Sequence, residues 1–117
     1  DYAQYTYSDV NLCSTSEMIY HFMDQMGDLA LLNKTIGAAL YTGIMTDTAS
    51  FRFPKTTSTT HRVVAHLMDV GVHHSDIHNK VYDANRFERI KLMGVALNNL
   101  TVLSDLNTAY ITLSYLP

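Results

Sequence analysis

A run of small and apolar residues precedes a single carboxylate, Asp47, in the middle of the chain. Apolar positions recur there at helical spacing, which predicts a helix from about Asn33 to Met45. Its small side chains let a neighbouring element approach closely: Gly37, Ala38, Ala39 and Gly43. A carboxylate at the C-terminal end of a helix opposes the helix dipole, which costs about 0.3–1 kcal/mol when the carboxylate is exposed. A cation would offset that cost, whereas the alternative is that Asp47 begins a solvated turn.

An aromatic–basic–aromatic triplet, residues 51–53, follows this carboxylate closely. Arg52, or Lys55 just beyond it, could meet a phosphate or a base, with a phenylalanine as the stacking face. The alternative is that the aromatic rings belong to the core and that the charges are solvated.

Apolar periodicity predicts further helices and a terminal pair of strands. The N-terminal segment 1–12, which contains Tyr2, Tyr5 and Tyr7, is expected to be extended. Ser14 and Thr15 begin a helix that ends at Gly27, with Ser14 and Glu17 at capping-box spacing. We expect its apolar stripe to face the core: Met18, Ile19, Phe22, Met23 and Met26. A third helix is expected to be capped by Ser58 or Thr59 and to end near Val70, with Met68 facing inward. Two more helices are expected over 76–83 and 85–98. Two strands are expected over 100–103 and 108–116.

Several segments together resemble the DHH-family phosphoesterases, and most closely their oligoribonuclease and pAp-phosphatase branch. Residues 41–53 (YTGIMTDTASFRF) are similar to the family's fourth conserved motif, although the family usually has Gly where this chain has Ala49. Residues 13–20 (CSTSEMIY) resemble an upstream helix start, and residues 89–97 (RIKLMGVAL) resemble the family's linking helix. Residues 109–113 (AYITL) resemble the first strand of its C-terminal, DHH-associated domain.

The Asp-His-His motif that gives the family its name is absent from this sequence. The pair His73-His74 follows Val72 and lies downstream of Asp47, so we do not interpret it as that motif. The start at Asp1, without Met, agrees with a middle segment of a longer protein. We therefore expect a mainly α-helical segment with a C-terminal β-hairpin, cut from a parent DHH domain of the α/β class. Residues 1–84 would end that domain, 85–99 would form the linking helix, and 100–117 would begin the second domain.

The resemblance implies a manganese-dependent hydrolase with a two-metal centre, in which Asp47 is a metal ligand. Such a centre holds the attacking water and the leaving oxygen of a phosphoryl group. Arg52, Ser14 and Thr15 are candidate substrate contacts, although capping alone explains Ser14 and Thr15. The implied substrates are short oligonucleotides (nanoRNA), linear dinucleotides or 3′-phosphoadenosine 5′-phosphate (pAp). One carboxylate cannot hold two metal ions, so this segment alone is expected to be inactive. Two alternatives stay open: an inorganic polyphosphate or pyrophosphate hydrolase of the same family, and a non-catalytic helical module that binds a protein.

Composition restricts the partners. Charged residues make up 16% of the chain, against about 25% in an average protein, which suggests that some surface contacts the remaining parts of the same protein or a second copy in a homodimer. The net charge of −3 gives no overall attraction to nucleic acid. One cysteine indicates a reducing, cytoplasmic compartment, and no apolar run reaches the length of a membrane span. The six histidines lack the spacing of a structural zinc site.

Overall fold

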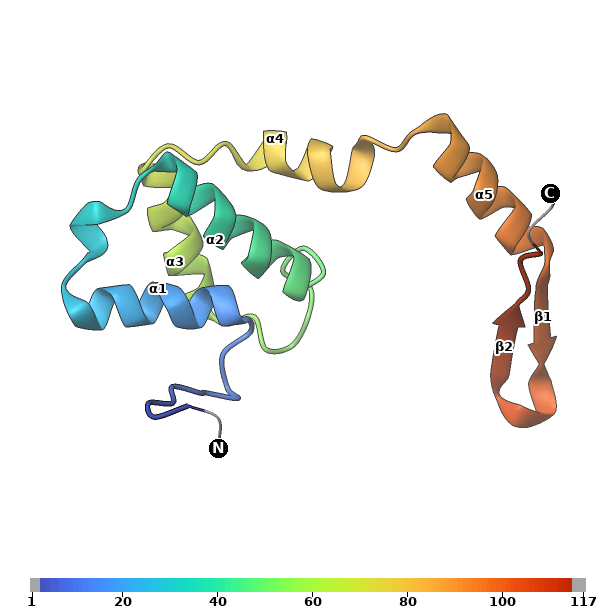
Figure 1. The fold of residues 1–117 in the computed structure, drawn as a ribbon, viewed down its shortest axis with the longest axis horizontal. Coiled ribbons are helices and arrows are strands. Elements are labelled where there is room, and N and C mark those ends of the chain that lie inside the picture. The colour runs from blue at the N-terminus through green and yellow to red at the C-terminus, as the bar shows by residue number, and fades with distance from the viewer. Residues whose placement is uncertain (1–2, 115–117) are drawn as a thin grey trace. The chain divides into compact units, whose positions relative to one another are not determined.

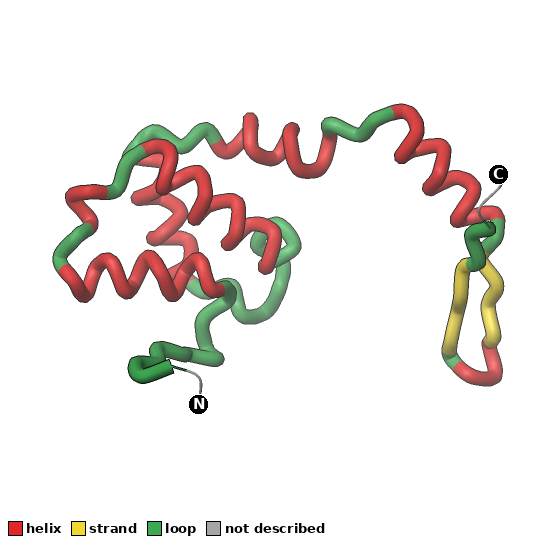
Figure 2. Tube along the Cα trace, viewed as in Figure 1, coloured by secondary structure: helices red, strands yellow, loops and turns green. Residues whose placement is uncertain are grey.

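The computed structural model describes residues 3–114, which divide into two compact units, residues 3–78 and 79–114. The first unit is helical, and the second contains a helix followed by a two-stranded antiparallel hairpin (Figures 1 and 2). The prediction of a mainly helical segment that ends in a β-hairpin is therefore confirmed.

Four α-helices and a short 3-10 turn form the helical unit. Their bounds are α1 Thr15–Met26, the 3-10 turn Leu29–Leu31, α2 Lys34–Asp47, α3 Ser58–Asp69 and α4 His74–His78. Side-chain caps explain where the longer helices begin, because Ser14, Asn33 and Thr57 each accept a hydrogen bond from the first turn. The predicted cap of α3 at Ser58 or Thr59 is wrong by one or two residues. Thr57 caps the helix because it and Thr60 bond each other's backbone N–H groups.

The core lies around α2, which packs against α1, α3 and α4. Its buried hydrophobic residues come from α1, α2, α3 and the loops before α2 and after α3: Tyr20, Leu32, Leu40, Tyr41, Ile44, Met45, Val63, Val64, Leu67 and Val72. The small residues of α2 allow close approach, as predicted. A Cβ atom on Gly43 would collide with the Oγ of Ser16 in α1, and one on Gly37 would lie 2.9 Å from Cγ2 of Val72.

The apolar stripe of α1 does not face this core, contrary to expectation. Ile19, Phe22 and Met26 are 47%, 50% and 61% exposed. Glu17 and Tyr20 occupy the buried face instead. The Tyr20 hydroxyl lies 2.6 Å from Nδ1 of His66 in α3, so a polar contact anchors this face. Met68 of α3 is likewise exposed and not inward, because Val63, Val64 and Leu67 complete the inner face of that helix.

The second unit begins with a π-helical turn, Asn79–Asp83, and continues with α5, Phe87–Asn98. The helix predicted over 76–83 is therefore wrong: α4 starts earlier, at His74, and its α-helical hydrogen bonding ends at His78. Strand β1, Leu100–Leu103, pairs with β2, Thr108–Ile111, from Leu100↔Ile111 to Leu103↔Thr108. Asn107 closes the hairpin in the left-handed conformation, which Asn tolerates better than most residues.

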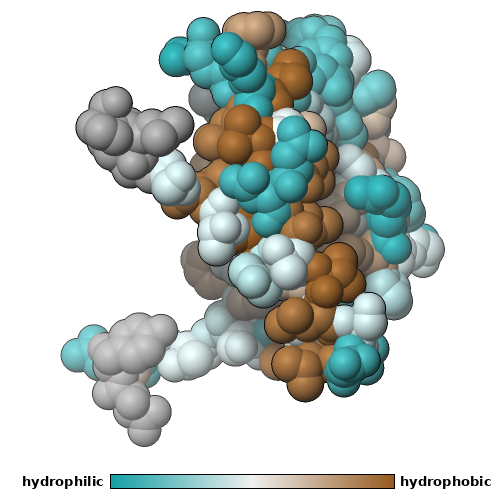
Figure 3. Space-filling model, turned by 90° about the vertical axis from the view of Figure 1, so that its right-hand side faces the viewer, coloured by the Kyte–Doolittle hydropathy of each residue, from teal (hydrophilic) through white to brown (hydrophobic). Residues whose placement is uncertain are grey.

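No residue of 79–114 is buried in this structure. The exposed side chains of α5 and the hairpin include many large apolar ones: Phe87, Ile90, Leu92, Met93, Val95, Leu97, Val102, Tyr110 and Ile111. Figure 3, which looks at the side that carries α5 and the hairpin, shows apolar surface in brown over much of this face. An isolated hairpin of this size is at best marginally stable in water. The unit thus presents apolar surface with no core of its own among the described residues.

The N-terminal segment forms no strand between residues 3 and 13, so the alternating tyrosines there do not indicate β-structure. The predicted second strand ends at Ile111 and not at Leu116. Tyr2 and Leu116 lie outside the described residues. Among residues 3–114, no helix combines the length and the apolar character that crossing a bilayer requires.

Candidate functional site

Three helix ends meet at one end of the helical unit (Figure 1). Ser16 in the first turn of α1 faces Gly43 near the end of α2. The Thr60 hydroxyl in the first turn of α3 donates to Oε1 of Glu17 in α1, at 3.0 Å. The start of α1, the end of α2 and the start of α3 are therefore neighbours. The fold brings the four residues predicted from the sequence to this end: Ser14, Thr15, Asp47 and Arg52.

Asp47 is the last residue of α2 and is exposed. Its carboxylate makes no hydrogen bond or ion pair with any residue between 3 and 114. Because the C-terminal end of a helix carries partial negative charge, this position is unfavourable for an exposed carboxylate by about 0.3–1 kcal/mol. Within the described part of the chain, no three His, Cys, Asp or Glu side chains converge on one point. The structure thus presents Asp47 as a single exposed carboxylate without a partner among the described residues.

A left-handed turn follows Asp47 and Thr48. Ala49, Ser50 and Phe51 have φ angles of 49°, 59° and 64°. Each such residue costs about 1–2 kcal/mol relative to the right-handed conformation, because its Cβ crowds the following carbonyl. Strain of this kind persists only where surrounding contacts hold it, and it is frequent at functional sites. The sequence carried one signal for this turn, which is that the resembling family usually has Gly at the position of Ala49.

Replacing Ala49 by glycine is expected to stabilise the helical unit by about 1 kcal/mol, because glycine adopts a positive φ without steric cost. The matched control is Ala39→Gly, an exposed position within α2, which is expected to destabilise the unit by about 0.5–1 kcal/mol. Urea unfolding followed by circular dichroism gives both free energies. Equal effects of the same sign at the two positions would contradict the left-handed geometry at Ala49.

Arg52 follows the left-handed turn directly and is exposed. Its Nε donates to the carbonyl of Ala49 at 2.7 Å. The two terminal nitrogens of its guanidinium make no hydrogen bond to the described residues, so they can meet a phosphate oxygen. Lys55 differs, because its ammonium group donates to the carbonyl of Val10 at 2.9 Å and ties the N-terminal segment to this loop. Of the two cations that follow Asp47, Arg52 is therefore the better candidate for an anionic ligand.

An aromatic cluster, which sequence reasoning missed, supports the turn from within the unit. The ring of Phe51 packs against Tyr41, at 5.9 Å between centroids, and against His61, at 5.7 Å. The Tyr41 hydroxyl lies 3.1 Å from Nε2 of His78, and burial raises the pKa of Tyr41. His74 lies inside α4, and its ring lies 6.3 Å from that of His78.

Ser14 and Thr15 begin α1. The Ser14 hydroxyl accepts from the backbone N–H of Glu17 at 3.1 Å, whereas Thr15 is exposed. The Glu17 carboxylate does not complete the expected capping box at Ser14. It accepts instead from the N–H of Cys13 at 3.1 Å and from Thr60, and it is 1% exposed. Burial, followed by the contact with Glu17, raises the pKa of the Cys13 thiol, so this cysteine is a poor nucleophile.

Replacing Glu17 by alanine is expected to lower the free energy of unfolding by about 1–3 kcal/mol, because the buried Thr60 hydroxyl and the half-buried N–H of Cys13 lose their acceptor. Glu17→Gln should cost less, since the Thr60 hydroxyl can reverse its hydrogen bond. Glu88→Gln in α5, where the side chain is exposed, is the control and should leave stability unchanged. Urea unfolding measures all three, and wild-type stability of Glu17→Ala would contradict a structural role for this network.

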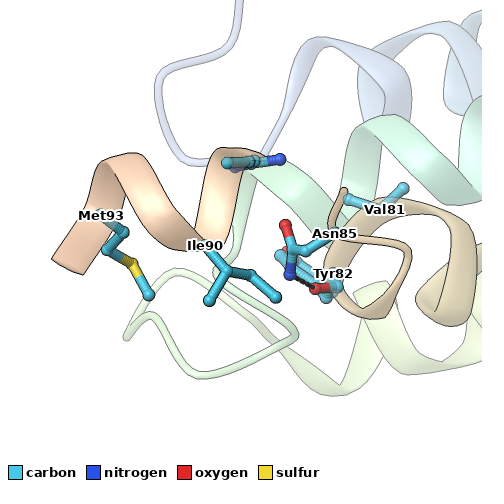
Figure 4. A pocket seen from close by; sticks show the side chains of 6 residues that line it. Val81, Tyr82, Asn85, Ile90 and Met93 are labelled. Atoms are coloured by element: carbon cyan, nitrogen blue, oxygen red, sulfur yellow. Dashed lines mark hydrogen bonds between the residues drawn. The ribbon is translucent and has the colours of Figure 1, made fainter. Parts of the chain in front are cut away.

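A pocket of about 160 Å³ lies in the second unit, between the π-helical turn and α5 (Figure 4). The Asn85 amide donates to the carbonyl of Tyr82 at 2.8 Å on one side of it, and Ile90 and Met93 line the other side. Sites for drug-sized molecules and cofactors are usually about 300–1,000 Å³. This pocket is smaller than such sites.

The sequence of this chain is similar to that of an oligoribonuclease and phosphatase, and its fold is similar to that of an exopolyphosphatase-related protein. The crystal structure of an exopolyphosphatase-related protein from Bacteroides fragilis matches 97% of this chain with a TM-score of 0.89 and 33% sequence identity. The match occupies 33% of that protein.

Two curated proteins are similar to this chain in sequence. The bifunctional oligoribonuclease and PAP phosphatase NrnA of Bacillus subtilis is 28% identical over 102 residues, which are 86% of this chain and 32% of NrnA. The uncharacterized protein MG371 of Mycoplasma genitalium is 38% identical over 81 residues, which are 69% of this chain and 24% of that protein. The chain thus spans a third or less of the length of these relatives. No model of a known protein family matches it.

Proposed function

We propose that this chain is a segment of a manganese-dependent phosphoesterase and that Asp47 is one of the metal ligands. The observation that carries the proposal is the free, exposed carboxylate of Asp47 at the end of α2, in a chain related to an oligoribonuclease and phosphatase. Carboxylate oxygens suit Mn²⁺. Since one carboxylate does not make a two-metal centre, the other ligands would come from the remaining parts of the same protein, in a parent domain of the α/β class.

A pair of metal ions at such a centre supplies an activated water and stabilises the charge that develops on the phosphoryl oxygens. The chain's own residues would bind and orient the substrate. The terminal nitrogens of Arg52 would hold a phosphate oxygen, as guanidinium groups commonly do. The first turns of α1 and α3 lie at the same end of the unit, and their partial positive charge favours an anion there. We propose that Ser14 and Thr15 contact the anionic substrate from the start of α1.

Short oligoribonucleotides, linear dinucleotides and pAp are the proposed substrates, because NrnA is described as an oligoribonuclease and PAP phosphatase. Polyphosphate or pyrophosphate is the second candidate, favoured by the likeness to an exopolyphosphatase-related protein. Both candidates require water attack on a phosphoryl group. The divisions at residues 84/85 and 99/100, a cytoplasmic location and a homodimer remain predictions.

The test compares this 117-residue chain with the full product of its gene, using pApA, pAp and polyphosphate with and without Mn²⁺. We expect manganese-dependent hydrolysis by the full product and none by the 117-residue chain. Turnover by the short chain alone would show that the metal ligands lie within it. Failure of the full product on all three substrates would overturn the proposal and favour the helical module that binds a protein. That module would bind its partner equally well with Asp47→Ala.

A further inference from the structure

Thr48 stands at the junction between α2 and the left-handed turn and is 0% exposed. Its hydroxyl donates to the carbonyl of Ile44 at 2.7 Å. The same oxygen accepts from the backbone N–H of Phe51 at 2.9 Å. One buried hydroxyl thus links the last turn of the helix to the last residue of the left-handed turn.

The main chain of Thr48 bonds the same segment. Its carbonyl accepts from the N–H of Arg52 at 2.9 Å and from the N–H of Phe53 at 3.1 Å. Three successive amides, those of residues 51, 52 and 53, therefore end on one threonine. This concentration of bonds explains how three left-handed residues without glycine remain in place.

We propose that Thr48 is the positioning residue of this site and that its hydroxyl fixes the direction of Arg52 relative to the carboxylate of Asp47. The inference rests on the proposed function of those two residues. The hydroxyl is the required group, because a methyl in its place cannot accept from Phe51 and leaves that N–H unpaired. The ring contacts of Phe51 with Tyr41 and His61 then lack a backbone anchor.

The chain offers a matched control on the other side of Asp47. The hydroxyl of Thr46 also donates to a carbonyl four residues earlier, that of Thr42, at 2.9 Å. Thr46 is exposed, and its hydroxyl makes no hydrogen bond to any described residue of the turn. Its backbone carbonyl accepts from the N–H of Ala49 at 3.3 Å, and a valine side chain leaves that bond in place. Thr46→Val therefore makes the same chemical change on the same helix, and Thr48→Ser keeps the hydroxyl and removes the methyl.

The first measurement uses NMR on the 117-residue chain, so it does not depend on activity. In Thr48→Val we expect the Phe51 amide to exchange about tenfold faster. The backbone shifts of residues 49–51 should leave their left-handed values. Thr48→Ser and Thr46→Val should keep both signatures. An unchanged turn in Thr48→Val would overturn the inference at its structural step.

The second measurement is kinetic and uses the full gene product. Thr48→Val is expected to lower kcat by about 10- to 100-fold, as misplacement of reacting groups by about 1 Å does. It should also raise the Mn²⁺ concentration for half-maximal rate, and Thr48→Ser should restore both. Wild-type activity in Thr48→Val, or an equal loss in Thr48→Ser, would overturn the inference. An inactive wild type would overturn the proposed function itself, so the two failures are distinguishable.

Discussion

Asp47→Asn in the full gene product is expected to lower kcat/KM for pApA by more than about 100-fold. Residues that only support a metal ligand typically cost about 10–100-fold in activity when they are mutated, and the loss of the ligand itself should cost more. The substitution should not destabilise the fold. Asn removes a negative charge from the C-terminal end of α2, where that charge is unfavourable, so stability should rise by about 0.3–1 kcal/mol. A loss of activity together with a gain of stability separates a functional from a structural role.

The matched control for this prediction is Asp69→Asn. Asp69 is also an exposed residue that ends an α-helix, α3. It should show the same small gain in stability and keep full activity. Steady-state kinetics with Mn²⁺ and urea unfolding of the 117-residue chain measure the two quantities. Equal losses of activity at Asp47 and Asp69 would contradict the assignment of Asp47 as a ligand.

The two units are expected to differ by orders of magnitude in the protection of their amides from hydrogen exchange. Ile44, Met45 and Leu67 are fully buried in the helical unit, so amides near them should be protected by about 10³-fold or more. Residues 79–114 have no buried member. A helix of 12 residues and a single hairpin are each marginal in water, so protection there should stay below about tenfold.

Exchange followed by NMR at two protein concentrations checks this difference. Ile44→Ala serves as the internal control, since it should lower protection in the helical unit and leave residues 79–114 unchanged. Strong protection in the second unit at the lower concentration, with the chain monomeric, would contradict the prediction. Protection that grows with concentration would indicate that a second copy covers the apolar face, as expected for a homodimer.

Local sequence signals predicted most helix positions well. The cap at Ser14 lies next to its own helix, so nearest-neighbour chemistry suffices to identify it. Apolar periodicity placed the end of α2 at about Met45, close to its observed end at Asp47. The short helix α4 was placed wrongly because five residues contain too little periodicity to define a boundary.

The candidate site was predicted in part. Its residues near Asp47 are close together in the sequence, so a motif reveals them. The aromatic rings that pack beneath the turn, those of Tyr41, His61 and His78, come from three segments that are distant in the sequence. No local pattern marks those contacts, because ring packing depends on how α2, α3 and α4 are arranged in space.

The sequence by itself determined the approximate course of the longer helices and placed one carboxylate near the end of α2, because caps and apolar spacing act over a few residues. Tertiary structure decided which face of α1 is buried. It chose Glu17 and Tyr20 over the more apolar stripe of Ile19, Phe22 and Met26. The physical reason is that Glu17 and Tyr20 find polar partners on α3, in Thr60 and His66, and such partners exist only after the helices pack.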